Sequence, residues 1–205
     1  MSIKSTQSIV NKVKNRIYGN GMGWCFTQTN FVDLKNDEAV KKALLRLNDV
    51  GIIRRISDGL YEYPRQHDKL GTLPPQIDKI AKAIAQRDGI RTQPSGAYAA
   101  NLIGLSEQVP GKVVFITDGA SKKLKVGKQE IIFKRTAAKN MASAGTQVGL
   151  LIQALKYFGK NNIDEVVLSR VKKNLKKIDP KDIVKNIKYA PQWIRGMVNK
   201  LLETQ

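Results

Sequence analysis

The chain contains 205 residues, of which 41% are hydrophobic and 26% charged, so its composition excludes intrinsic disorder and suffices for one large or two small domains. Its 36 Lys and Arg residues outnumber its 17 Asp and Glu residues, which gives a formal net charge of +19. Such an excess predicts a polyanionic partner, because cationic side chains that neutralise phosphates release the counterions condensed on them.

The first 34 residues predict two helices. Apolar residues such as Val13 and Ile17 recur at helical spacing within residues 5–18, and the glycine-rich segment at 19–23 ends that helix. Thr27 is a favourable N-cap for a short second helix. Because the N-terminus of a helix attracts phosphate groups, Thr27 and Gln28 are predicted to contact the DNA backbone.

Residues 36–64 predict a third helix followed directly by a hairpin. Val40 and Leu47 lie on one helical face, and Gly51 is the residue type that ends a helix. β-branched and aromatic residues flank the Ser-Asp-Gly sequence at 57–59, a pattern typical of two strands joined by a tight turn. The order helix, short helix, turn, helix, hairpin predicts a winged helix-turn-helix.

In a winged helix, the third helix enters the major groove and the hairpin contacts the backbone or the minor groove. The predicted DNA-binding residues are Thr27, Gln28, Asn36, Lys41, Lys42, Arg46, Arg54 and Arg55. Arg46 is the predicted guanine reader, because a guanidinium can donate two hydrogen bonds to this base. The alternatives are a solvated helix face and a winged helix that binds a protein.

The remainder of the chain predicts a separate, larger domain. A segment rich in Pro, Gly and charge at 67–75 reads as a linker, which leaves a winged helix domain at 1–66 and a second domain at 76–205. We expect an α+β protein, whose second domain combines a small antiparallel sheet with C-terminal helices. The predicted helices at the C-terminus are residues 146–158, 164–177 and 182–202.

Three predicted strands carry much of the positive charge of the second domain. They are residues 112–117, 122–126 and 129–135, and we expect them to form an antiparallel meander. A second basic patch on these strands consists of Lys122, Lys123, Lys125, Lys128, Lys134 and Arg135. If this patch contacts phosphates, replacing Lys122 and Lys123 should weaken binding to all DNA sequences alike and reduce the salt dependence.

The distribution of charge along the chain agrees with a contribution of the second domain to DNA binding. Residues 1–70 hold 12 Lys and Arg against 7 Asp and Glu, whereas residues 71–205 hold 24 against 10. The net charge is therefore +5 in the first part and +14 in the second.

Sequence motifs for catalysis, metal binding and nucleotide binding are absent: GxGxxG, GxxxxGK[ST], HExxH, CxxC and GxSxG do not occur. Cys25, the only cysteine, is predicted to be a small buried residue of the core. His67 is the only histidine. We expect no enzymatic activity, no cofactor and no metal. A metal-dependent nuclease that uses Asp118, Glu130 and Lys134 is the weaker alternative, because Glu130 and Lys134 would lie about 13 Å apart along one strand at about 3.3 Å per residue.

The location of the protein is also predicted. No run of 18 apolar residues and no signal-peptide core occur, so we expect a soluble, cytoplasmic protein without a membrane span. A single cysteine cannot form an intrachain disulfide, which is consistent with a reducing compartment.

The segments FTQTNFVDL and NDEAVKKALLRLNDVGIIRRISDGLYEYP resemble the N-terminal winged helix of AbiEi-type antitoxins from type IV toxin–antitoxin systems. PSGAYAANLIGLSEQVPGKVVFITDG, KKLKVGKQEIIFKR and the closing helices are similar to the C-terminal antitoxin domain of that family, so the resemblance covers nearly the whole chain. It implies a repressor that binds inverted repeats in its own promoter and counters a nucleotidyltransferase-like toxin during abortive infection. It also implies that the positive surface of the C-terminal domain assists DNA binding.

Three functional hypotheses remain. The first is a transcriptional autorepressor and antitoxin, with double-stranded DNA and a nucleotidyltransferase-like toxin as partners. The second is a DNA-binding regulator or protein-interaction adaptor without a toxin partner, whose basic surface in the adaptor case meets an acidic protein. The third and weakest is the metal-dependent nuclease.

Overall fold

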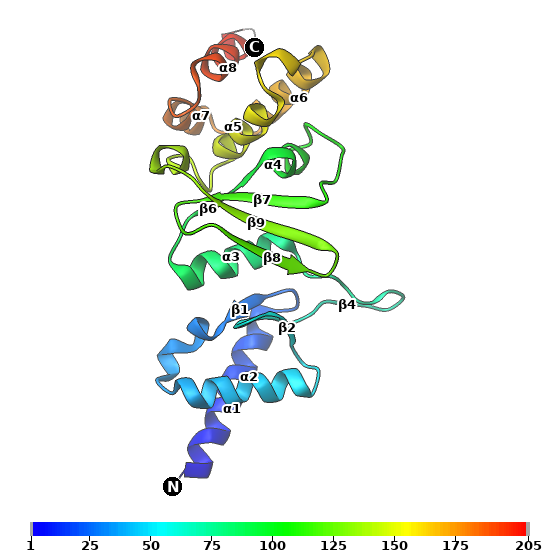
Figure 1. The fold of residues 1–205 in the computed structure, drawn as a ribbon, viewed down its shortest axis with the longest axis vertical. Helices are drawn as coiled ribbons and strands as arrows, with labels where there is room; N and C mark the ends of the chain where they lie inside the picture. Colours follow the sequence, from blue (N-terminus) through cyan, green and yellow to red (C-terminus); the bar gives the residue numbers. More distant parts are fainter. Residues whose placement is uncertain (1, 204–205) are drawn as a thin grey trace. The chain divides into compact units, whose positions relative to one another are not determined.

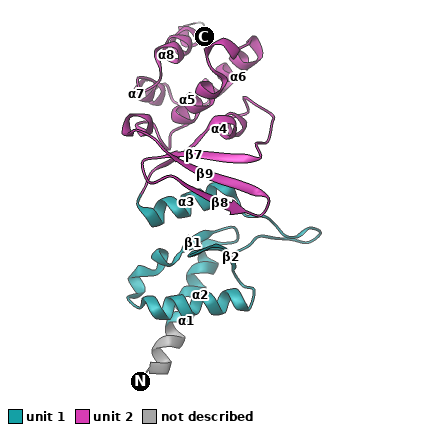
Figure 2. Ribbon diagram, viewed as in Figure 1, with its two compact units in different colours: residues 1–89 teal, residues 90–205 magenta. Residues whose placement is uncertain are grey.

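The computed structural model describes residues 2–203, with side chains from residue 9 onward (Figure 1). The chain forms two compact units, residues 1–89 and residues 90–205 (Figure 2). The expected α+β composition is confirmed, because helices and small sheets occur in both units. Within residues 2–203, no helix combines the length and the apolar composition that crossing a bilayer requires.

Unit 1 contains four helical segments and two small sheets. Its elements in chain order are α1 (Ser2–Asn20), β1 (Cys25–Thr27), the 3₁₀ helix η1 (Gln28–Leu34), α2 (Asp37–Asp49), β2 (Arg54–Ser57), β3 (Leu60–Glu62), β4 (Gln66–His67), β5 (Gly71–Thr72) and α3 (Ile77–Asp88). Strands β1, β3 and β2 form one antiparallel sheet in that spatial order, so β3 is central. Strands β4 and β5 form a separate two-stranded hairpin.

The boundary between the two units differs from the predicted linker at 67–75. Part of that segment is the β4–β5 hairpin, and α3, which the sequence assigned to the second domain, belongs to unit 1. Helix α3 packs against β1. It buries Ile80 and Ile84 on one face. Helix α3 therefore belongs to unit 1, because its apolar face is buried there, although the segment before it has the composition of a linker.

The core of unit 1 joins α1, α2 and η1 to one face of the β1–β3–β2 sheet. Helix α2 contributes the apolar stripe that includes Val40 and Leu44. Aromatic rings fill the centre, with Phe26 stacked on Tyr61 and in edge contact with Phe31. Buried aromatic side chains supply much of the burial energy available to a unit of this size.

Unit 2 is built on a four-stranded sheet. Its elements are β6 (Thr92–Ser95), α4 (Gly96–Leu102), β7 (Lys112–Thr117), β8 (Lys122–Val126), β9 (Gln129–Arg135), the 3₁₀ helix η2 (Ala138–Met141), α5 (Gln147–Phe158), the 3₁₀ helix η3 (Lys160–Asn162), α6 (Glu165–Leu175), α7 (Pro180–Ile187) and α8 (Gln192–Glu203). The spatial order of its strands is β6-β7-β9-β8.

The predicted antiparallel meander is wrong. Strand β7 pairs with β9 in parallel, and β8 lies at the edge, where it pairs only with β9 in the antiparallel sense. The sheet is therefore mixed. The reason is burial: β7 and β9 carry fully or nearly fully buried residues such as Phe115, Ile131 and Phe133, whereas β8 alternates lysines with apolar residues. Apolar strands favour the centre of a sheet, and lysine-rich strands favour its edge.

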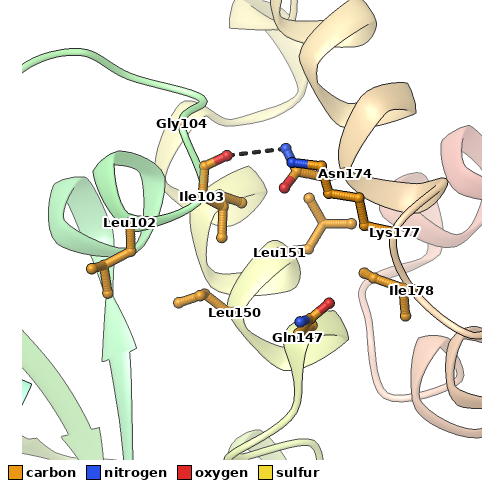
Figure 3. A pocket seen from close by; sticks show the side chains of 9 residues that line it. All are labelled: Leu102, Ile103, Gly104, Gln147, Leu150, Leu151, Asn174, Lys177 and Ile178. Atoms are coloured by element: carbon orange, nitrogen blue, oxygen red, sulfur yellow. Dashed lines mark hydrogen bonds between the residues drawn. The ribbon is translucent and has the colours of Figure 1, made fainter.

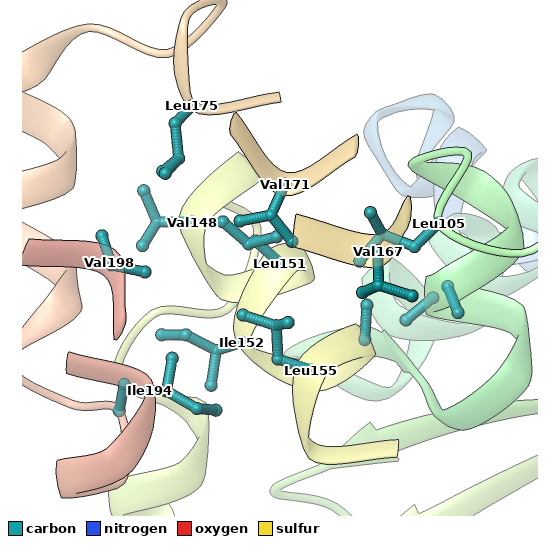
Figure 4. Close-up of a cluster of buried hydrophobic side chains, with 14 of the residues drawn as sticks. Leu105, Val148, Leu151, Ile152, Leu155, Val167, Val171, Leu175, Ile194 and Val198 are labelled. Atoms are coloured by element: carbon teal, nitrogen blue, oxygen red, sulfur yellow. The ribbon is translucent and has the colours of Figure 1, made fainter. Parts of the chain in front are cut away.

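The helices of unit 2 pack around an apolar cluster (Figure 4). Buried residues of α5, such as Leu151 and Leu155, contact side chains from α4, α6 and α8. The single helix predicted at 182–202 is in fact two, α7 and α8, because the chain turns at Pro191. Proline has no backbone N–H and its ring clashes with the preceding turn, so a helix rarely continues through it.

Candidate nucleic-acid interface

Helix α2 presents a basic face to solvent. Its buried side includes Val40 and Leu47, while Lys41, Lys42 and Arg46 are all exposed on other sides of the helix. The 3.6-residue repeat produces this separation, because the apolar positions occupy one stripe. Three of the predicted DNA-binding cations are therefore free to meet a ligand.

The same exposed surface also carries acidic and apolar groups. Glu38 and Asp49 are exposed on α2, and 41% of Leu45 is accessible. The helix is consequently less uniformly basic than its lysine and arginine content implies. A nucleic acid in contact with α2 would be recognised by a few cations and not by a continuous positive stripe.

Asn36 forms the N-cap of α2. Its Oδ1 accepts a hydrogen bond from the backbone N–H of Ala39 at 3.0 Å, which satisfies one of the unpaired donors in the first turn. The side-chain oxygen of Asn36 is therefore used within the helix. Its Nδ2 remains the group with which this predicted contact residue could donate to DNA.

Thr27 and Gln28, the predicted phosphate contacts, serve mainly to hold η1 in place. Thr27 is only 1% exposed, its Oγ1 lies 2.7 Å from Thr29 Oγ1, and its backbone N–H donates to Asn30 Oδ1. Gln28 Nε2 donates to the backbone oxygen of Asp37 at 2.9 Å, which joins η1 to α2. Burial thus prevents the Thr27 side chain from reaching a phosphate, whereas Gln28 stays partly exposed.

Arg16 and Asp33 fix η1 against α1. Two nitrogens of the Arg16 guanidinium each donate to one Asp33 oxygen at 2.6 Å, and one of them also donates to Asn30 O at 2.7 Å. The Arg16 hydrogen bonds hold the pKa of the Asp33 carboxyl below its usual range. This bidentate pair was not predicted, because its residues belong to different elements.

Arg54 and Arg55 of β2, the two residues predicted to contact DNA from a wing, have different environments. Arg54 Nε donates to Glu62 Oε2 at 3.1 Å, and its Nη2 donates to the backbone oxygen of Leu73 at 2.9 Å. Glu62 is 0% exposed, so Arg54 is the cation that neutralises a buried carboxylate. Arg55 is exposed and pairs with the exposed Asp58. Of the two predicted wing contacts, only Arg55 therefore presents its charge at the surface.

The predicted second basic patch is divided by the register of β8 and β9. Lys123 pairs with Ile132 and Lys125 with Glu130, so these lysines share a face of the sheet with Lys134. Lys122 pairs with Phe133, and its Nζ lies 5.1 Å from the centroid of that ring. Because successive residues of a strand point to opposite faces, Lys122 and Arg135 lie on the other side. Lys128 occupies the turn between β8 and β9. Lys122 and Lys123 thus cannot act as one contact.

The carboxylates of the nuclease alternative have other partners. Asp118 accepts hydrogen bonds from the backbone N–H and the Nε of Arg91, both at 2.8 Å, and these bonds lower the pKa of its carboxyl. Glu130 lies 3.9 Å from Lys112 Nζ. Across the residues that the structure describes, no group of three or more His, Cys, Asp and Glu side chains could hold a metal ion.

Cys25 is buried in β1, in agreement with its interpretation as core filler. Burial, with a contribution from the Glu62 carboxylate, raises the pKa of the Cys25 thiol to about 12. The thiol is therefore protonated at neutral pH, and a protonated thiol is a poor nucleophile.

A pocket in unit 2 lies between α4, the start of α5 and the end of α6 (Figure 3). It is lined mainly by leucine and isoleucine side chains, and Asn174 on its rim donates to the backbone oxygen of Ile103 at 3.0 Å. Its polar side chains are the amides of Gln147 and Asn174 and the ammonium of Lys177. Among the described residues, no Ser, Cys, His, Asp or Glu side chain lines this pocket.

A family model described as "Family of unknown function (DUF6088)" matches residues 9–183, which cover most of both units. No curated protein shows significant similarity to the chain.

Proposed function

The chain belongs to the DUF6088 family, a family of unknown function, and we propose that it is a DNA-binding transcriptional regulator that uses unit 1 as a winged helix. The arrangement of unit 1 supports this proposal. Helix α1, strand β1, η1, α2 and the β2–β3 hairpin follow one another in winged-helix order, and β1 completes the sheet beside the hairpin.

The observation that carries the proposal is the exposure of Lys41, Lys42 and Arg46 on the helix that would enter the major groove. Exposed Lys and Arg also occur on solvated helix faces, so the support comes from their position on the second long helix of a winged-helix element order. Cations on such a helix can contact phosphates at the groove edge and hydrogen-bond acceptors on bases.

In the proposed mechanism, one set of residues supplies affinity for any DNA sequence and another residue supplies discrimination between bases. Lys41 and Lys42 contact phosphates, while Arg46 donates two hydrogen bonds to the O6 and N7 of a guanine. Arg55 on the wing contacts the adjacent backbone. Arg54 has a different role, because it neutralises Glu62 and thereby supports the strand that carries the wing. Two copies of the protein on an inverted repeat would double these contacts.

The resemblance to AbiEi-type antitoxins extends the proposal. On this basis, the operator is an inverted repeat in the promoter of the protein's own gene, and unit 2 counters a nucleotidyltransferase-like toxin. The protein would then be both autorepressor and antitoxin in an abortive-infection system. A nucleotidyltransferase encoded beside the gene, and loss of its toxicity on co-expression, are the observations that test this extension.

The DNA-binding proposal is tested with Arg46→Ala. A preferred operator is first selected from randomised duplexes, and affinity is then measured for that operator and for each single-base variant. We expect the binding free energy for the preferred operator to fall by about 1–3 kcal/mol, and the discrimination between bases to weaken at one position. The matched control is Arg195→Ala, which removes an exposed arginine from α8 of unit 2.

Two results would reject the proposal in different ways. Unchanged affinity and base preference of Arg46→Ala would remove Arg46 as a base reader. If the wild-type protein binds no duplex at low ionic strength, the DNA-binding function itself is wrong, and the adaptor hypothesis replaces it.

A further inference from the structure

Strand β8 forms a free, positively charged edge of the unit 2 sheet. It pairs with β9 on one side and is the last strand in the order β6-β7-β9-β8. An edge strand leaves backbone N–H and C=O groups of alternate residues without a partner in the sheet. Such an edge can accept an additional strand from another polypeptide.

The hairpin geometry identifies which backbone groups face the open edge. Strands β8 and β9 are joined by a two-residue turn, Gly127 and Lys128, and Val126 pairs with Gln129 on either side of it. A two-residue hairpin closes on a hydrogen-bonded pair, and the pairs alternate along an antiparallel ladder. The N–H and C=O groups of Lys125 and Lys123 therefore point away from β9.

The side chains of the same two residues supply the charge beside that edge. Lys123 and Lys125 are exposed and lie on one face of β8, because they are two positions apart. Lys128 is exposed at the turn. A hollow at this end of the hairpin is lined by Lys123, Leu124, Lys125, Lys128, Gln129 and Glu130. Leu124 is half-buried on the opposite face of β8, which it shares with Lys122.

We propose that the β8 edge binds an extended, acidic segment of a partner protein, which adds to the sheet as a fifth strand. The backbone of the segment would bond to Lys123 and Lys125, and carboxylates at alternate positions would lie beside the two ammonium groups. Opposite charges on directly paired positions of adjacent strands attract, whereas like charges repel. This inference concerns unit 2 and does not depend on DNA binding by unit 1.

The same rule disfavours a second copy of the chain as the occupant. Antiparallel pairing of two β8 strands would bring lysines of one copy next to lysines of the other. Lysines on an edge strand normally prevent promiscuous pairing for this reason. Only a negatively charged strand would have a favourable electrostatic interaction with the lysines of β8.

Nucleic acid is the competing ligand, because a phosphate backbone also attracts lysines. The difference lies in the backbone groups: a DNA strand needs only the positive charges, whereas an added β-strand also needs the outward N–H of Lys125. A proline at an edge position whose N–H faces solvent leaves the ladder to the neighbouring strand intact. Lys125→Pro and Lys125→Ala therefore form a matched pair that lose the same charge and differ in this donor.

The experiment uses the full chain and a fluorescent, end-capped peptide that alternates Glu and Val. A second peptide of equal charge, with two valines replaced by proline, cannot form a continuous strand. We expect the wild-type protein to bind the first peptide and to bind the second at least about 5-fold more weakly. Lys125→Pro should weaken binding of the first peptide about 2–12-fold more than Lys125→Ala, which corresponds to one backbone hydrogen bond.

Equal weakening by Lys125→Pro and Lys125→Ala, with equal affinity for the two peptides, would overturn the proposal and leave recognition by charge alone. Binding of duplex DNA at this edge without binding of either peptide would overturn it in favour of nucleic acid. Amide hydrogen exchange of the wild-type protein provides a readout that needs no variant. The first peptide should protect the amides of Lys123 and Lys125, and the absence of protection at both would reject strand addition.

Discussion

The two units use their charged side chains differently. In unit 1, Arg54 neutralises the fully buried Glu62, whereas Arg16 holds the exposed Asp33 with two hydrogen bonds at the surface. In unit 2, the helices pack through an apolar cluster, and the carboxylates paired with Arg91 and Arg170 remain partly or fully exposed, as do cations such as Lys123 and Lys125. Arginine suits the first task, because its planar guanidinium can donate to a carboxylate and a backbone oxygen at once.

A count of positive residues therefore overstates the charge available to a ligand. Arg16 and Arg54 contribute to the net charge of unit 1, yet Arg54 is paired with the buried carboxylate of Glu62 and Arg16 with the carboxylate of Asp33. Exposed cations of unit 1 include Lys41, Lys42 and Arg46 on α2 and others on α1, α3 and the loops, such as Lys12 and Lys79. Three substitutions test this difference between the units.

The largest effect is expected for Arg54→Ala. The substitution leaves the Glu62 carboxylate buried without its cation, and removal of one partner from a buried pair is costly. We expect unit 1 to lose about 3 kcal/mol of stability. Urea denaturation followed through Trp24 in a Trp193→Phe background would measure it, because these tryptophans lie in different units. The control is Arg55→Ala, whose partner Asp58 is exposed. Equal urea midpoints for the two variants would contradict a supporting role for Arg54.

A smaller loss of stability is expected in unit 2 for Gly149→Ala, and its cause is steric crowding. A Cβ on Gly149 of α5 would lie 2.0 Å from the backbone oxygen of Ser143, so Gly149→Ala forces the chain before α5 to move. We expect a loss of about 1–3 kcal/mol, seen through Trp193 and not through Trp24. Gly196 of α8 has open space around it, so Gly196→Ala should be neutral or stabilising. A destabilised unit 1 in Gly149→Ala would show that the units do not respond separately.

The smallest effect concerns Asp33→Asn and depends on pH. Arg16 lowers the pKa of Asp33 in the folded protein below its ordinary value of 3.8, so the pair stabilises unit 1 above that value. This stabilisation is lost as the pH falls through the folded pKa. Asp33→Asn should therefore have a lower urea midpoint than the wild type at pH 7, and the difference should shrink in acid. In an Arg16→Gln background the substitution should have no such pH dependence; a difference that persisted would contradict the assignment.

Local patterns predicted several elements accurately. The spacing of Val40, Leu44 and Leu47 predicted helix α2 and its buried side, and the glycine after it ends the helix as expected. The exposure of Arg46 followed from the same spacing. These predictions succeeded because helical periodicity and capping depend on residues only a few positions apart.

Some missed features join distant segments, whereas others had a local signal. Glu62 is an acidic residue at the end of an apolar strand, an anomaly that signals a buried partner, but its pairing with Arg54 and the further bond to Leu73 require the folded sheet. The break between α7 and α8 was detectable, since Pro191 is visible in the sequence. The lysine alternation in β8 was also a signal for an edge strand that the predicted meander ignored.

Neighbouring residues and composition were enough to predict helix α2, the β2–β3 hairpin, strands β7, β8 and β9 and the excess of positive charge. Only the tertiary structure decided that β7 pairs with β9, that α3 belongs to unit 1, and which cations remain exposed. The physical reason is that a strand, a helix face or a charge selects its partner by the burial and neutralisation it gains, and that gain depends on segments brought together by folding.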